Sequence, residues 1–214
     1  MTELLFIRHG ETDWNAQQRF QGQIDVPLNA MGRAQAARLG QRLEGEPHDA
    51  LFSSDLSRAQ ETAAPLAAAW GRQPTLVPGL REQSFGVLEG LDVPTIKQQH
   101  PDLWQEWLEH RGDFALPGGE SLQQFHRRVM DAVRTLATAG AGQRLVIVTH
   151  GGVLDMLWRT ARSEPLSGLR QCEIPNTGIN RLHWAGNTLH IDRWADAEHL
   201  SGLPPQPSTV AGER

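Results

Sequence analysis

The chain has 214 residues and a net charge of −5, with 20 lysines and arginines against 25 aspartates and glutamates. This length is typical of one α/β domain whose core is large enough to fold without disulfides or a metal. The acidic balance argues against a nucleic-acid-binding protein, which usually presents a basic face. Cys172 is the single cysteine, so no internal disulfide can form, which favours a reduced, cytoplasmic protein.

Hydropathy argues against a membrane partner. No stretch approaches the roughly 20 consecutive apolar residues that a membrane-spanning helix needs. The apolar segment at the N-terminus lacks the cationic region and cleavage site of a signal peptide. We therefore expect a cytoplasmic protein, and the sequence leaves open whether it is a monomer or a homodimer.

Apolar runs alternate with helical periodicity in the first part of the chain. The pattern predicts a strand at 3–8, a helix at 29–43, a strand at 49–53, a helix at 56–70 and a short strand at 75–77. Asn29 is placed to cap the first of these helices, and Gly71 to end the second. The sequence changes abruptly from apolar to polar at the end of the first strand, where Arg8, His9 and Gly10 follow the apolar residues directly.

The second part of the chain begins with an irregular region, 78–93, after which predicted helices and strands alternate again. The predicted elements are helices at 94–110 and 120–138, a strand at 144–149, a helix to Arg162, and hairpin strands at 170–183 and 187–194. Ser121 with Gln124 resembles a capping box. Gly186-Asn187 is typical of a tight hairpin turn. The Pro-rich segment 195–214 is predicted to be a disordered tail.

Strands that alternate with helices indicate a three-layer α/β/α sandwich with a mostly parallel central sheet. Ligands of such sheets bind beyond the carboxyl ends of the strands. His9 and His150 each follow a predicted strand, and each is followed at once by glycine. We therefore expect both imidazoles at one ligand-binding edge of the sheet.

The residues beside these histidines indicate phosphate chemistry. Arg8 is a permanent cation next to His9, and cationic neighbours lower the pKa of an imidazole. A neutral imidazole has a lone pair that can attack an electrophile. Arginine forks match the oxygens of a phosphoryl group. A site that gathers arginines around a neutral histidine is therefore suited to a phosphate ester.

The stretch from Arg8 to Asn15, RHGETDWN, resembles the signature of the histidine phosphatase superfamily, also called the phosphoglycerate mutase-like family. Further blocks that resemble the family follow in order at 20–28, 53–62, 80–90 and 148–152. The resemblance covers roughly residues 3–194, and it implies one phosphoglycerate mutase-like domain over residues 1–194. Residues 80–120 are then expected to form an insertion that covers the substrate.

The resemblance implies hydrolysis through a phosphohistidine, without a metal or a cofactor. His9 would be the nucleophile and Glu82 the general acid and base. The residues expected to hold the phosphoryl group are Arg8, Arg58 and His150, with Asn15, Gln21, Gly22 and Gly151 lining the substrate side. Placing Arg58 near the start of its helix would add the favourable N-terminal dipole.

Several carboxylates in these blocks have simpler roles. Without the resemblance, Glu82 is best interpreted as a loop carboxylate paired with Arg81. We interpret Asp55 as a helix cap, and Glu61 and Glu89 as structural partners outside catalysis.

The other histidines form no recognisable metal-binding pattern. They are His48, His100, His110, His126, His183, His190 and His199. Trp104, Trp107 and Leu108 recur at helical spacing, which favours a packing face over the alternative of an apolar lid above the substrate.

The family contains both phosphatases and bisphosphate-dependent mutases. A mutase needs cations for a second acidic group, yet Lys97 and Arg111 are the only lysine and arginine between Gly90 and Glu120. Arg127 and Arg128 are adjacent on a helix, where neighbours point about 100° apart. We therefore predict a phosphatase that acts on small phosphorylated metabolites, with a bisphosphate-dependent phosphoglycerate mutase and a non-catalytic phosphate-binding scaffold as the alternatives.

Overall fold

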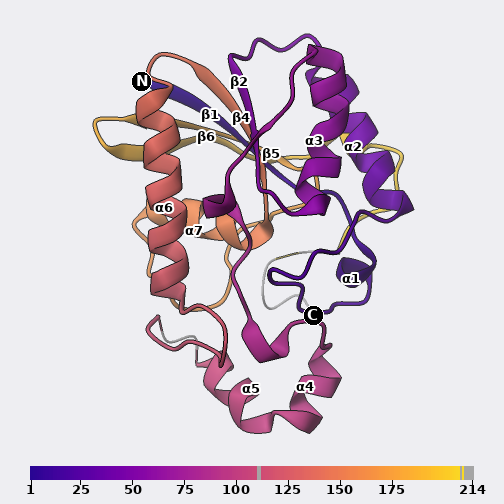
Figure 1. Ribbon diagram of the computed structural model, residues 1–214, viewed down its shortest axis with the longest axis vertical. Helices are drawn as coiled ribbons and strands as arrows, with labels where there is room; N and C mark the ends of the chain where they lie inside the picture. Colours follow the sequence, from indigo (N-terminus) through magenta and orange to yellow (C-terminus); the bar gives the residue numbers. More distant parts are fainter. Residues whose placement is uncertain (110–111, 208, 210–214) are drawn as a thin grey trace.

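One six-stranded sheet runs through the computed structural model, which describes residues 1–109, 112–207 and 209 (Figure 1). The strand order is β3-β2-β4-β1-β5-β6. Strands β1 to β4 pair in parallel, and β5 and β6 pair antiparallel. The strands are β1 (Thr2–Arg8), β2 (Ala50–Ser53), β3 (Thr75–Leu76), β4 (Arg144–Thr149), β5 (Ile179–Ala185) and β6 (Thr188–Asp196). The predicted mostly parallel sheet is confirmed.

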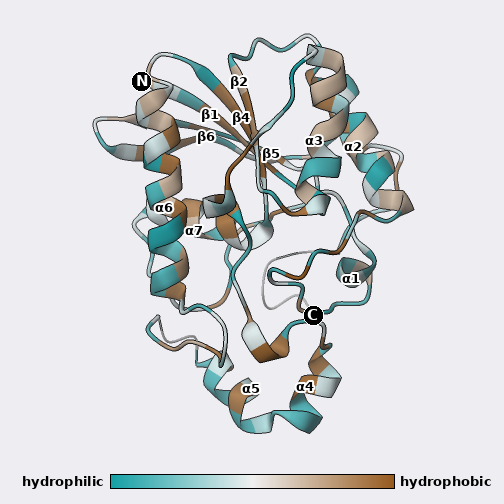
Figure 2. Cartoon of the chain, in the orientation of Figure 1, coloured by the Kyte–Doolittle hydropathy of each residue, from teal (hydrophilic) through white to brown (hydrophobic). Residues whose placement is uncertain are grey.

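Helices cover both faces of the sheet, as Figure 1 shows. Because side chains alternate along a strand, Leu4 and Phe6 of β1 enter one core, whereas Leu5 and Ile7 enter the other. The first core includes α6 (Leu122–Ala139) and α7 (Gly151–Arg162), and the second includes α2 (Ala30–Leu43) and α3 (Ser57–Trp70). In Figure 2 α6 is striped teal and brown, as expected for a helix with one buried face.

Local capping signals are confirmed at three helix ends. The side chain of Asn29 accepts a hydrogen bond from the Gly32 N–H at the start of α2. Ser121 and Gln124 form the reciprocal capping box of α6. Gly71 ends α3 with a left-handed φ of 61°, which glycine adopts without steric cost.

The interpretation of Asp55 as a helix cap is wrong. The carboxylate of Asp55 instead accepts two hydrogen bonds from Arg81, at 2.6 and 2.8 Å. The N-cap of α3 is Leu56, which offers no side-chain acceptor, and Asp25 accepts a hydrogen bond from the Ser57 N–H at 2.7 Å. Competition from the arginine, far along the sequence, therefore removes Asp55 from the cap.

The single helix predicted at 94–110 is two helices, α4 (Val93–Gln99) and α5 (Pro101–Leu108). The break lies at His100, because a residue before proline is disfavoured in the helical conformation. His110 and Arg111 lie outside the described residues. In Figure 1 the two helices lie at the end of the molecule away from the sheet. They have a small core of their own, centred on Leu88, Ile96 and Leu116.

The end of the chain differs from the prediction in two places. Residues 170–178 form a loop, because Pro175 cannot donate a ladder hydrogen bond, and β5 begins only at Ile179. The hairpin turn at 186–187 is confirmed. The disorder predicted from Ala195 onward is wrong for the described part, because β6 extends to Asp196 and the side chain of Gln206 bonds both backbone groups of Asn176.

Candidate active site

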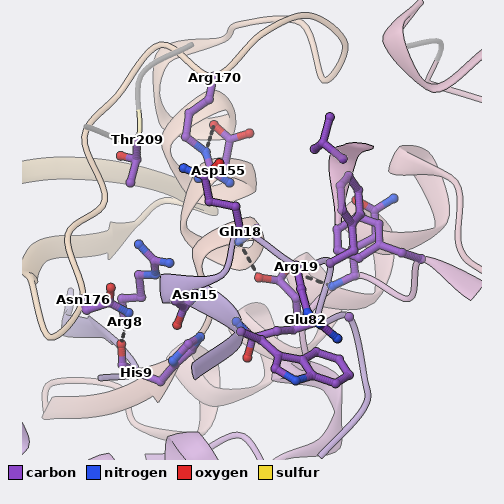
Figure 3. A pocket seen from close by; sticks show the side chains of 18 of the residues that line it. Arg8, His9, Asn15, Gln18, Arg19, Glu82, Asp155, Arg170, Asn176 and Thr209 are labelled. Atoms are coloured by element: carbon purple, nitrogen blue, oxygen red, sulfur yellow. Dashed lines mark hydrogen bonds and ion pairs between the residues drawn. The ribbon is translucent and has the colours of Figure 1, made fainter. Parts of the chain in front are cut away.

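A pocket of about 870 Å³ opens beyond the carboxyl end of β1 (Figure 3). Of the residues predicted to form the site, seven line it: Arg8, His9, Asn15, Gln21, Gly22, Arg58 and Glu82. His150 lies behind this surface, fully buried, with its ring centroid 5.2 Å from that of His9. The two strand-ending histidines therefore meet, since β1 and β4 are parallel neighbours.

The backbone on either side fixes the His9 imidazole in position. Its amide donates to the Thr149 carbonyl at 2.8 Å, and its carbonyl accepts from the Asn176 side chain at 2.9 Å. Nδ1 lies 2.7 Å from the carbonyl oxygen of Gly10. A carbonyl only accepts, so Nδ1 carries the proton and Nε2 keeps its lone pair.

The charge state of His9 follows from its surroundings. Burial lowers the pKa of His9 well below its ordinary value, and the nearby guanidinium groups of Arg58 and Arg8 lower it further. The hydrogen bond to the Gly10 carbonyl opposes this shift without reversing it. At neutral pH the imidazole is therefore uncharged and can act as a nucleophile.

Arg58 links several parts of the site. It is the second residue of α3 and is fully buried. Its Nη1 and Nη2 donate to the carbonyls of Ile24 and Gly22 at 2.9 and 2.7 Å, and its Nε donates to His150 Nδ1 at 3.2 Å. A guanidinium has five N–H donors. Two remain for a ligand after these three hydrogen bonds.

His150 is held in one tautomer by the same contacts. Because Nδ1 accepts from Arg58, the proton of the neutral ring is on Nε2, which lies 2.8 Å from the Ser54 hydroxyl oxygen. Burial lowers the pKa of His150 well below its ordinary value, and Arg58 adds to the effect. Both ring nitrogens of His150 are therefore engaged within the protein, and its contact with the phosphoryl group stays a prediction.

Arg8 has an unused donor at the pocket. Its Nη1 donates to the Ile174 carbonyl at 2.6 Å, whereas its buried Nε has no hydrogen-bond partner among the described residues. Burial and the cation of Arg170 lower the pKa of Arg8 to about 10. A Cβ placed on Gly151 would lie only 3.4 Å from this Nε. An anion in the pocket would satisfy the free donor.

Asn15 and Gln21 are oriented through Thr12. Oδ1 of Asn15 accepts from the Thr12 N–H at 3.1 Å within the capping box of the short helix α1 (Asp13–Ala16). Oε1 of Gln21 accepts from the Thr12 hydroxyl at 2.9 Å. With both carbonyl oxygens occupied, the amide NH₂ groups of Asn15 and Gln21 are the ends available to a ligand.

Glu82 is held by backbone amides. Its Oε2 accepts from the Gly152 N–H at 3.0 Å, and its Oε1 from the Gln83 N–H at 2.9 Å. A Cβ on Gly152 would collide with the Glu82 carboxylate, so this position requires glycine. The alternative in which Glu82 pairs with Arg81 is wrong, because Arg81 pairs with Asp55.

Neighbouring charged residues support this arrangement from outside the pocket. Arg128 donates to the carbonyl of Glu82 at 3.1 Å and forms a bidentate pair with Glu120. Glu89 accepts backbone hydrogen bonds from Gln23 and Phe85, in line with its predicted structural role. Glu61 lies 3.8 Å from Arg33 on the surface.

Sequence reasoning missed other polar residues of the site. Thr62 accepts a hydrogen bond from the Gly10 N–H at 2.9 Å, and Asn176 holds the His9 carbonyl. Ser54 contacts His150, and Arg170 lines the pocket. The Pro-Asn-Thr-Gly run at 175–178 is a turn signal that could have placed Asn176 in a loop. No local signal marks Arg170.

Aromatic side chains form the outer wall of the pocket. Trp104 and Trp107 stack at 5.9 Å with an interplanar angle of 10°, and Phe20 meets both edge to face. The same tryptophans pack against the small core of α4 and α5 and line the pocket. The predicted alternatives, packing face and apolar lid, therefore describe two sides of one aromatic cluster.

Within residues 1–109, 112–207 and 209, none of the helices combines the length and the hydropathy of a membrane-spanning segment. Within the same residues, no group of three His, Cys, Asp or Glu side chains is arranged to hold a metal ion.

Comparison with known proteins identifies the family. The profile of the histidine phosphatase superfamily (branch 1) matches residues 4–197. A metal-independent phosphoserine phosphatase of Arabidopsis thaliana is 36% identical over 206 residues, covering 95% of this chain and 85% of the relative. Phosphoglycerate mutase-like protein 4 of the same plant is 37% identical, covering 99% of this chain and 93% of the relative.

A solved structure agrees with these sequence relatives. YhfR of Bacillus stearothermophilus superposes with a TM-score of 0.87 at 31% identity, covering 94% of this chain and all of that one. Both the profile and the fold extend over nearly the whole chain, from β1 to the end of β6. The chain belongs to the histidine phosphatase superfamily.

Proposed function

We propose that the protein hydrolyses phosphomonoesters of small metabolites through a phosphohistidine formed on His9. The observation that carries the proposal is the state of this imidazole, which is buried, neutral and hydrogen-bonded through Nδ1 to Gly10. That bond leaves Nε2 as the nucleophilic atom at a pocket that Arg8 and Arg58 also line. Family membership and the phosphatase relative support the same reaction.

In the first step, the Nε2 lone pair of His9 attacks phosphorus, and the bond from phosphorus to the ester oxygen breaks. Glu82 donates a proton to the departing oxygen. The free Nε–H of Arg8 and the two remaining N–H groups of Arg58 bind the non-bridging oxygens as charge develops on them. The products are an alcohol and a phosphohistidine whose Nδ1–H still bonds Gly10.

In the second step, water attacks the phosphohistidine and Glu82, now ionised, accepts a proton from that water. The bond between phosphorus and Nε2 breaks, which regenerates neutral His9 and releases phosphate. Positioning and charge stabilisation account for most of phosphoryl-transfer catalysis. His150 contributes by orienting Arg58 through the hydrogen bond to its Nε, and Asn15 and Gln21 offer amide donors to the phosphate.

The lining and the volume of the pocket limit the size of the substrate. Residues 80–120 cover it, since Glu82, Phe85, Trp104 and Trp107 line one pocket. The pocket volume of about 870 Å³ suits a small metabolite better than a polymer. The single thiol, Cys172, is buried, and burial raises its pKa to about 12, so it takes no part in the reaction. We also propose a cytoplasmic location, because a single cysteine favours a reducing compartment.

A phosphoglycerate mutase is the main alternative, because several relatives are named phosphoglycerate mutase-like or probable phosphoglycerate mutase. Against it, Arg128 is committed to Glu120 and to backbone carbonyls, and Arg127 lines a separate surface hollow. A non-catalytic scaffold is less well supported, because a chain without turnover would not need both His9 and Glu82 in place.

The pure protein should release phosphate from p-nitrophenyl phosphate and from a panel of phosphorylated metabolites in the presence of a chelator. A parallel reaction should contain 3-phosphoglycerate with 2,3-bisphosphoglycerate. Isomerisation much faster than phosphate release would replace the phosphatase with a mutase. Inactivity on every phosphoester would favour the scaffold.

The role of Glu82 has its own test. Glu82→Gln cannot protonate a leaving group, so the loss of kcat should be larger for alkyl phosphates than for p-nitrophenyl phosphate. Glu44→Gln, at an exposed helix end, is the matched control and should leave both rates unchanged. Equal losses on both substrates in Glu82→Gln would remove Glu82 from acid catalysis.

A further inference from the structure

Two oppositely charged groups in the pocket lack hydrogen-bond partners. Nε of Arg170 and Oδ1 of Asp155 are buried, and neither has a hydrogen bond within the described residues. They lie 4.0 Å apart, within the distance of an ion pair but beyond that of a hydrogen bond. Both residues line the pocket, as Figure 3 shows. Buried polar groups are normally satisfied, so such a pair indicates a place where a ligand binds.

The loop that carries Arg170 is firmly held. Arg159 of α7 is fully buried and donates to the carbonyls of Pro165, Ser167, Gly168 and Leu169 at 2.6 to 2.9 Å. Nε of the same arginine donates to Asp155 Oδ2 at 3.2 Å. One buried side chain therefore anchors the loop up to the residue before Arg170 and occupies one oxygen of Asp155. The other oxygen is left at the pocket.

This pair lies close to the proposed phosphate position. A Cβ on Gly151 would be 3.4 Å from Arg8 Nε and 3.9 Å from Arg170 Nη1, so the two guanidinium groups flank the start of α7. The Arg170 cation is also the largest charge effect lowering the pKa of Arg8. A group bound by Arg170 would therefore lie close enough to the phosphate to belong to the same small molecule. It would be attached within a few bonds of the ester oxygen.

We propose that Arg170 and Asp155 form a second subsite that binds a carboxylate and an adjacent ammonium group of the substrate. The proposal rests on the proposed phosphatase function and narrows its substrate class to O-phosphorylated hydroxy amino acids. The carboxylate accepts from the Arg170 guanidinium, and the ammonium donates to the free Oδ1 of Asp155. A zwitterion satisfies both orphan groups at once, whereas a simple anion would leave the Asp155 oxygen without a donor and facing a like charge.

Three substrates separate these contacts. O-phosphoserine has both groups, 3-phosphoglycerate has the carboxylate without the ammonium, and O-phosphoethanolamine has the ammonium alone. Arg170→Gln should lower the ratio of kcat/KM for O-phosphoserine to that for O-phosphoethanolamine roughly ten- to hundredfold, the usual effect of losing a charge-assisted hydrogen bond. Arg162→Gln, an exposed arginine at the end of α7, should leave that ratio unchanged.

Asp155→Asn tests the ammonium contact. It should lower the ratio of kcat/KM for O-phosphoserine to that for 3-phosphoglycerate about tenfold, and an unchanged ratio would overturn the assignment of Asp155. An equal loss on all three substrates in Arg170→Gln would overturn the subsite and make Arg170 part of phosphate binding. If the wild-type protein hydrolyses no phosphoester at all, including p-nitrophenyl phosphate, the proposed function fails rather than the subsite alone.

Discussion

The inner end of the pocket and its outer wall are built in different ways. At the inner end, His9, Arg58 and Glu82 are held by hydrogen bonds to the backbone of neighbouring segments. At the outer wall, Phe20, Trp104 and Trp107 are held by aromatic contacts with one another. Directional bonds fix atoms to within fractions of an ångström, as phosphoryl transfer requires. Apolar packing tolerates changes in shape. We infer that the inner end determines the chemistry, whereas the outer wall limits the size and shape of the apolar part of the substrate.

The largest effect is expected at Arg58, where the inner end is most tightly connected. Arg58→Gln would leave the carbonyls of Gly22 and Ile24 without donors and would free His150. We expect kcat/KM for p-nitrophenyl phosphate to fall about 10³-fold. The free energy of unfolding should also fall by about 3 kcal/mol, since several buried acceptors lose their partners.

Urea unfolding and steady-state kinetics measure both effects. Arg134→Gln, an arginine with 58% of its side chain exposed, is the control and should change neither, because surface ion pairs contribute little. A well-folded and fully active Arg58→Gln protein would show that the inner end does not depend on this network.

Gly152→Ala should misplace Glu82 without removing it. The added methyl group would collide with the carboxylate, which must then move from the backbone amides that hold it. A displacement of about 1 Å typically costs about 10²-fold in rate. We expect that loss of kcat for alkyl phosphates and a smaller loss for p-nitrophenyl phosphate.

The control for this variant is Gly45→Ala, because a Cβ on Gly45 meets no atom within 4 Å. Normal turnover of alkyl phosphates by Gly152→Ala would mean that the position of Glu82 does not limit the reaction.

Residues that follow a strand could be placed from the sequence, whereas contacts between residues far apart in the chain could not. His9 and His150 were placed correctly at one sheet edge, since each follows an apolar strand and parallel neighbours align their ends. The partner of Asp55 was not predictable, because local sequence favours a cap whereas Arg81 lies 26 residues away. The break at His100 could have been predicted, because proline at position 101 disfavours the helical conformation of the residue before it.

The loop that carries Arg170 gave no such local signal. Its conformation depends on hydrogen bonds from the buried side chain of Arg159 to the loop carbonyls. From the sequence alone, an arginine in a helix would be expected on the surface. Side chains that bind distant backbone groups follow no periodic pattern in the sequence. The pocket residues outside the family motifs could therefore be identified only from the structure.

Trp107→Ala tests the outer wall. Removing the indole should raise KM for a bulky ester such as naphthyl phosphate three- to tenfold, the typical contribution of an aromatic contact, while kcat changes little. Trp70, the last residue of α3, is not part of the pocket lining, and Trp70→Ala should leave KM unchanged. A tenfold fall in kcat for Trp107→Ala would show that the outer wall also controls the chemical step.

The smallest effect concerns pH and stability. The pKa values of His9 and His150 lie well below their ordinary values in the folded protein, chiefly because of burial. Below about pH 6.5 the unfolded chain takes up protons that the folded protein does not, so the free energy of unfolding falls as pH falls. Each such histidine contributes up to about 1.4 kcal/mol per pH unit.

His9→Gln should remove one of these contributions, seen as a shallower pH dependence of urea unfolding between about pH 6.5 and pH 5. His126→Gln should reduce the slope less, since His126 is half-buried and burial lowers its pKa less strongly. An unchanged slope in His9→Gln would contradict a neutral His9.

The nucleophile can be identified by rapid quenching of the protein with ³²P-labelled substrate, followed by peptide mapping under alkaline conditions. We expect acid-labile, base-stable label on the peptide that contains His9, attached at Nε2, and none in His9→Ala. Label on a different residue, or full turnover by His9→Ala, would contradict the account.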